Sequence, residues 1–156
     1  MNVIMYTEIV NEHFSPVNYP CPPLNMKQLL HKLPPYTFTV IIVAVIAYLT
    51  LVPHPLPDND MELFPGADQV VHAIMFGALT GAIALDRALK NGIKALGAKS
   101  LVIYAIIGSL AGGVIELLQG WMGAGRSADV WDFVADTLGA ILAACMARPV
   151  IKRWFL

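Results

Sequence analysis

Four stretches of the chain are almost entirely apolar, and polar or proline-rich segments separate them. They lie at 36–52, 67–88, 100–121 and 127–148. Each has at least about 17 residues, which is the shortest length at which a helix crosses the hydrocarbon core of a membrane. A lone strand in lipid leaves its backbone polar groups unpaired, so we predict helices. The pattern therefore predicts an all-α, polytopic membrane protein built as a bundle of four transmembrane helices.

The segments around this domain differ from it in composition. Residues 1–35 mix polar, aromatic and proline residues, and they lack the basic start and apolar run of a secretory signal. We interpret them as a flexible or interfacial leader to the transmembrane domain at 36–148. Ser127 is the expected N-cap of the last helix. Pro149 is expected to end that helix, which leaves 149–156 as a basic tail.

The composition points to lipid as the solvent of this chain. Hydrophobic residues make up 57% of it and charged residues 13%, whereas a soluble domain is about one quarter charged. The net charge of −1 argues against a nucleic-acid partner. We expect membrane lipids to be the main partners, and a homo-oligomer stays open.

The basic residues indicate an orientation in the membrane. Every Lys and Arg except Arg126 falls in the leader, in the segment from Arg87 at the end of the second helix through the loop at 89–99, or in the tail and the residue before it. With four spans these three segments share one side, which the positive-inside rule assigns to the cytoplasm. Both termini are then cytoplasmic, and Arg126 lies on the outer side.

Three of the predicted helices carry polar side chains within apolar sequence. They are Asp68 and His72 in the second helix, Glu116 and Gln119 in the third, and Asp129, Asp132 and Asp136 in the fourth. Because the helices alternate in direction, all of these residues fall toward the outer boundary. At about 1.5 Å per residue most of them share a layer roughly 6–8 Å below it, with Asp136 one turn deeper. We therefore predict a single polar site at the outer end of the bundle.

Two of the helices have stripes in which small and polar residues share a face. The stripes are Gly108, Gly112, Glu116 and Gln119 in the third helix, and Asp129, Asp132, Asp136 and Gly139 in the fourth. Small residues allow close packing in lipid, and polar side chains avoid lipid. The third and fourth helices are thus expected to pack together with the acids between them. Gly77 and Gly81 in the second helix form a further G-x-x-x-G pair.

The predicted site has more acidic than basic groups. Since an unpaired carboxylate away from water is costly, protons must be shared, or a metal ion or a cationic ligand group must bind. The sequence does not distinguish shared protons from a bound metal ion or a cationic ligand group, and it indicates no particular cofactor. The candidate catalytic residues are His72, Glu116, Asp132 and Asp136, and the candidate ligand-binding residues are Asp68, Gln119, Arg126 and Asp129.

Several of these residues also have a purely structural interpretation. Asp129 lies near a helix start, where the helix dipole favours acids. Glu116 can pair with Arg126 to hold the turn, and His72 can be a packing residue whose hydrogen bonds are satisfied. Glu116 and Asp136 are the strongest functional candidates, because ionisable residues inside a membrane span are usually functional.

The segments ADQVVHAIMFG, GGVIELLQ and GRSADVWDFVADTLGA, in this order, resemble the VanZ-like family of small bacterial membrane proteins. The resemblance covers about residues 38–146, and Asp136 stands where the family commonly has Asn. It implies a multi-pass protein of the bacterial cell envelope, in the cytoplasmic (inner) membrane. It also implies a link to antibiotic resistance, because the founding member is associated with resistance to the glycopeptide teicoplanin.

Three functions are compatible with these features. The first is an outward-facing pocket for the headgroup of an envelope lipid or of a lipid-linked cell-wall precursor. Arg126 would hold a phosphate or carboxylate there, and His72 with Glu116 or Asp132 would handle protons or hold a cation. The second is a non-catalytic module whose polar network locks the bundle. The third is an ion or proton conductor, and whether the protein is an enzyme stays open.

Overall fold

The computed structural model is all-helical in the part of the chain that it describes, residues 29–30, 32–52, 65–122 and 129–155. Its elements are α3 (Thr37–Leu51), α4 (Ala67–Asn91), the 3-10 helix η1 (Ile93–Leu96), α5 (Ala98–Met122) and α6 (Val130–Trp154). No strand occurs in these residues, as the all-α prediction requires. Most of the predicted leader lies outside them.

Three of the helices are long and apolar enough to cross a membrane. They are α4, α5 and α6, each with 25 residues. The helix α3 is also apolar but has 15 residues. At 1.5 Å per residue it is about 22 Å long, compared with about 30 Å for the hydrocarbon core of a bilayer. The fourth span therefore stays a prediction.

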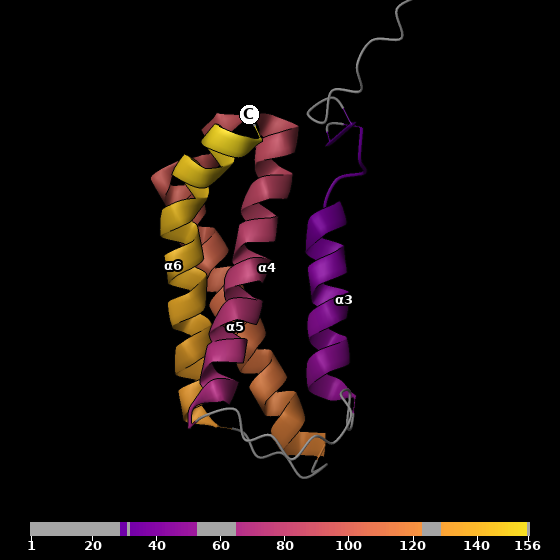
Figure 1. The fold of residues 1–156 in the computed structure, drawn as a ribbon, viewed down its shortest axis with the longest axis vertical. Coiled ribbons are helices and arrows are strands. Elements are labelled where there is room, and N and C mark those ends of the chain that lie inside the picture. The colour runs from indigo at the N-terminus through magenta and orange to yellow at the C-terminus, as the bar shows by residue number, and fades with distance from the viewer. Residues whose placement is uncertain (1–28, 31, 53–64, 123–128, 156) are drawn as a thin grey trace, which may run out of the picture.

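The bundle is arranged around α4. In Figure 1, α4 lies between α3 and α6, and α5 crosses behind it. The helices α4 and α6 run in the same direction, while α3 and α5 run the opposite way. The starts of α4 and α6 and the end of α5 therefore share one end of the bundle, which we call the site end.

The last helix differs from its prediction at both ends. The expected N-cap, Ser127, lies outside the described residues, and α6 begins only at Val130. Its N-cap is Asp129, whose Oδ1 accepts a hydrogen bond from the backbone N–H of Trp131 at 2.8 Å. The expectation that Pro149 ends the helix is wrong, because α6 continues through it to Trp154.

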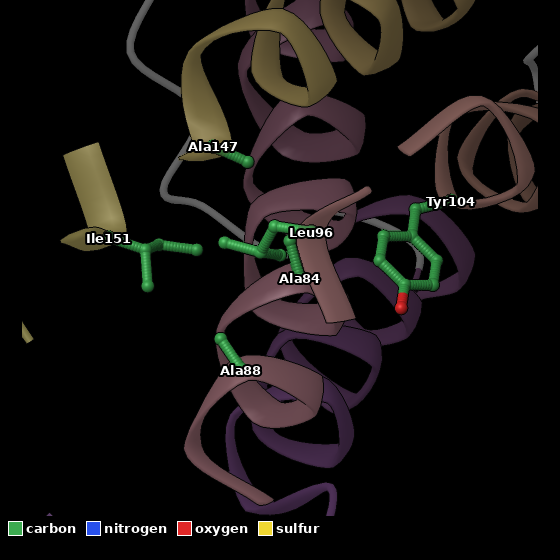
Figure 2. Packing of buried hydrophobic residues seen from close by; sticks show 6 residues of the cluster. All are labelled: Ala84, Ala88, Leu96, Tyr104, Ala147 and Ile151. Carbon is green, nitrogen blue, oxygen red and sulfur yellow. The ribbon is translucent and has the colours of Figure 1, made fainter. Parts of the chain in front are cut away.

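The burial of Ile151 explains why α6 continues beyond Pro149. A proline inside a helix costs about 3 kcal/mol. Ile151 is 4% exposed and belongs to a cluster with Ala84, Ala88, Leu96, Tyr104 and Ala147. Figure 2 shows this cluster, which lies at the end of the bundle opposite the site end. Full burial of an isoleucine side chain contributes about 1.5–3 kcal/mol, which offsets most of the proline cost.

Two glycines bring the backbones of α4 and α6 together. A Cβ on Gly77 would lie 3.1 Å from the carbonyl oxygen of Gly139, and a Cβ on Gly139 would collide with the carbonyl of Ala73. Gly81 differs, because a Cβ there would meet nothing within 4 Å. Of the predicted G-x-x-x-G pair, only Gly77 serves close packing.

Glycines of α5 allow close contacts of this helix with α4 and α6. A Cβ on Gly108 would collide with Thr80 Oγ1 of α4 and lie 3.1 Å from Ala140 Cβ of α6. A Cβ on Gly112 would collide with the side chain of Asp136. The prediction that the third and fourth helices pack with an acid between them is confirmed, and α4 joins the same contact.

A second polar contact attaches α3 to the rest of the bundle. Asp86 near the end of α4 accepts hydrogen bonds from Thr39 N at 2.8 Å, Thr39 Oγ1 at 2.7 Å and Phe38 N at 3.4 Å. These amides belong to the first turn of α3 and lack partners within that helix. Asp86 therefore caps α3 from outside, a role that its place in the sequence does not reveal.

Candidate functional site

The imidazole of His72 is the centre of a buried polar cluster at the site end. His72 lies on α4 and is 2% exposed. Its Nδ1 lies 3.1 Å from Asp136 Oδ1 of α6 and 3.5 Å from Glu116 Oε1 of α5. Three helices thus each deliver one ionisable side chain to the same point. With Asp132, these residues are called the polar cluster below.

The two acids nearest to His72 are held there by their neighbours. Asp136 is fully buried, and it fits because Gly112 opposite has no side chain. Glu116 Oε2 accepts a hydrogen bond at 3.0 Å from the backbone N–H of Asp129, the N-cap of α6. The carboxylate of Glu116 therefore connects α5 to the start of α6 and leaves its other oxygen facing His72.

His72 also has a second pair of acids, Asp68 and Asp132, near its imidazole. A ring nitrogen of His72 and one carboxylate oxygen from each of these two acids lie within 4.8 Å of one another. Asp132 is buried, whereas Asp68, in the first turn of α4, is exposed. Asp68 is thus the most accessible acid of this grouping.

Three carboxylate oxygens of the polar cluster have no hydrogen-bond partner among the described residues. They are Glu116 Oε1, Asp132 Oδ1 and Asp136 Oδ2. Glu116 Oε1 is close to His72 Nδ1, but the Nδ1 hydrogen bond goes to Asp136. Buried acceptors without partners are uncommon in native proteins and need an explanation. Chemically, the arrangement can share a proton or receive a cation.

Two of the predicted ligand-binding residues make hydrogen bonds that hold the fold. Gln119 is buried, and its Nε2 donates to the backbone carbonyl of Thr50 in α3 at 3.2 Å. Asp129 caps α6. Thr50, which sequence reasoning did not identify, links α3 to the site end, and only its tertiary contact reveals this. Arg126, the predicted anion ligand, lies outside the described residues.

The described basic residues gather at the end of the bundle away from the polar cluster. They are Lys32, Arg87, Lys90, Lys94, Lys99, Arg148, Lys152 and Arg153, which precede α3, end α4, lie in η1, begin α5 or end α6. The bundle therefore has a basic end and, at the opposite ends of the helices, the end that carries the polar cluster. Figure 1 shows that the end of α4, the start of α5 and the end of α6 lie together, away from the start of α4, the end of α5 and the start of α6.

Comparison with known proteins gives one clear relationship. No curated protein and no solved structure matches the chain. The family model described as VanZ/LLP1 matches residues 24–153. This range includes all of the polar cluster, and it begins before residue 38, so it also takes in the last part of the predicted leader. The chain belongs to the VanZ/LLP1 family.

Proposed function

We propose that the protein binds the polar headgroup of an envelope lipid, or of a lipid-linked cell-wall precursor, at the polar cluster. The observation that supports this most is the meeting of His72, Glu116 and Asp136, from three apolar helices, with partnerless carboxylate oxygens. Such groups are costly inside a membrane protein and are usually retained for a function. Their depth also suits a headgroup, because they lie within about two turns of the helix ends.

The proposal includes a topology. The chain spans the bacterial cytoplasmic membrane four times, with α3 as the short first span and both termini in the cytoplasm. The separation of basic residues from the polar cluster supports this, because the positive-inside rule places the basic end in the cytoplasm. The polar cluster then faces the outer leaflet, where lipid-linked precursors are used.

The chemistry of the ligand follows from the mixture of charges. Arg126 holds a phosphate or carboxylate of the headgroup through its planar guanidinium. Asp68 and Glu116 accept from its hydroxyl or ammonium groups, and His72 exchanges protons with it. Binding a cell-wall precursor would change exposure of that precursor to teicoplanin, which connects this proposal to glycopeptide resistance.

Native mass spectrometry of the detergent-purified protein tests the proposal, with a polyprenyl phosphate and phosphatidylglycerol as probes. We expect both probes to bind. Arg126→Ala should weaken binding of the polyprenyl phosphate, and Glu116→Gln should weaken binding of phosphatidylglycerol, whose glycerol hydroxyls donate to the carboxylate, each at least about tenfold, since a hydrogen bond to a charged group contributes about 1.5–3 kcal/mol. Arg153→Ala, at the basic end, is the matched control and keeps wild-type affinity. Equal affinity in all four proteins would contradict the proposal.

A second function is favoured by the way the polar side chains bridge helices. The contacts His72–Asp136, Glu116–Asp129 N and Gln119–Thr50 O join four helices in pairs. In a module that uses them only to lock the bundle, Glu116→Ala, which removes the acceptor of Asp129 N, lowers thermal stability while lipid binding is absent in every variant. The same titration therefore separates the two functions.

A further inference from the structure

The distances around His72 Nδ1 match those between ligand atoms on one metal ion. Nδ1 lies 3.1 Å from Asp136 Oδ1 and 3.5 Å from Glu116 Oε1. Tetrahedral zinc with bonds of about 2.0–2.1 Å places its ligand atoms roughly 3.3–3.4 Å apart. Ligand atoms of His72, Glu116 and Asp136 all lie within 4.8 Å of one another. The three side chains can therefore hold one ion with little movement.

Partnerless oxygens give an independent reason to expect an ion. Glu116 Oε1 and Asp136 Oδ2 have no hydrogen-bond partner among the described residues, although Glu116 is 5% exposed and Asp136 is 0% exposed. Asp132 Oδ1, one turn closer to the start of α6, also lacks a hydrogen-bond partner among the described residues. A structural role for these acids would pair the oxygens with donors, as it does for Asp86, which accepts three hydrogen bonds.

The charges of the polar cluster favour a dication. Glu116, Asp132 and Asp136 supply three carboxylates, and His72 is the one basic side chain within this buried group of described residues. The imidazole selects the metal, because imidazole ligands suit first-row transition metals, whereas Mg²⁺ and Ca²⁺ prefer oxygen ligands alone.

We propose that His72, Glu116 and Asp136 bind a divalent first-row transition-metal cation such as Zn²⁺ or Mn²⁺, with Asp132 Oδ1 beside it. This inference rests on the proposed function for the role of the ion, which is to bridge the protein to an anionic headgroup. The ion neutralises the acids and leaves a coordination position for a phosphate oxygen. Loss of one ligand leaves two side chains, too few to hold the ion against water.

Metal content of the purified protein tests this site directly. The protein is purified with a tag that contains no histidine, stripped with EDTA, dialysed against Zn²⁺, Mn²⁺ or Mg²⁺, and measured by inductively coupled plasma mass spectrometry. We expect about one Zn²⁺ or Mn²⁺ per chain and no retained Mg²⁺. Glu116→Gln and Asp136→Asn should weaken binding at least about tenfold.

Two control variants locate the ion within the cluster. The first control is Thr137→Val, which changes the residue that follows Asp136. The hydroxyl of Thr137 lies 2.7 Å from that of Ser109, so this variant should bind metal like the wild type. Asp68→Asn should also keep the metal. The proposed metal site is overturned if the wild-type protein retains no transition metal. It is also overturned if Asp68→Asn loses the metal while Glu116→Gln retains it.

The lipid titration, repeated with and without EDTA, separates this inference from the proposed function. Lipid binding that survives EDTA, in a protein that holds no metal, overturns the metal site and leaves the proposed function intact. Retention of about one ion per chain with no lipid binding supports the metal site and overturns the proposed function. Loss of lipid binding on EDTA treatment, with recovery on adding Zn²⁺ or Mn²⁺, supports both.

Discussion

Replacing Gly139 with alanine is expected to destabilise the bundle by about 3 kcal/mol, the upper end of the usual cost of overpacking. The new Cβ would collide with the carbonyl oxygen of Ala73 and lie 2.7 Å from its carbonyl carbon. These are backbone atoms of α4, which cannot rotate away as a flexible side chain would. The two helices must separate, and the His72–Asp136 contact one turn away loosens with them.

Thermal unfolding in detergent, followed by tryptophan fluorescence, measures this effect. At about 2–4 °C per kcal/mol, we expect the melting temperature to fall by roughly 6–12 °C. Gly81→Ala is the matched control, since its Cβ meets nothing within 4 Å. It should keep or raise the melting temperature, because alanine favours a helix over glycine by about 1 kcal/mol. Equal effects of the two substitutions would show that the helices do not meet at Gly139.

His72→Gln is expected to destabilise the EDTA-treated protein by about 3 kcal/mol or more, the usual cost of breaking a buried ion pair. The substitution removes the basic side chain and leaves Glu116, Asp132 and Asp136 facing one another. Glutamine can still donate a hydrogen bond, so the loss reports the charge and not the space that the ring fills.

Glu116→Gln is the comparison for this prediction and should leave the stability unchanged or raise it. It reduces the number of acids, and its amide oxygen can still accept from Asp129 N, the 3.0 Å contact of the wild type. Both variants are followed by thermal unfolding in EDTA. A larger loss for Glu116→Gln than for His72→Gln would mean that the cluster does not carry excess negative charge.

The sequence predicts the polar cluster well because helix direction and spacing determine depth. The distances of His72, Glu116, Asp132 and Asp136 from the helix ends predict one layer for them, and in the structure all four are buried, with the three acids near His72. Their partners are less predictable. Gln119 shares the face of Glu116 in sequence but bonds to Thr50 O of α3, since hydrogen-bond partners depend on which helices are adjacent.

Other features depend on tertiary contacts that no local pattern contains. Gly77 and Gly81 form the same motif, but only one of them faces α6. Pro149 is a valid helix-stop signal, and it is overridden by the burial of Ile151 two residues later. Asp86 resembles an ordinary charged residue near a helix end, whereas it caps α3, whose first turn lies 47 residues away in the chain.

A double-mutant cycle between His72 and Asp136 tests most directly whether acids and an imidazole from separate helices meet inside the bundle. His72→Gln, Asp136→Asn and the double variant are unfolded by SDS titration in mixed micelles containing EDTA. We predict a coupling free energy of at least about 1 kcal/mol, with the double variant more stable than His72→Gln alone. Effects that add to within about 0.5 kcal/mol would place the two side chains apart and contradict the account.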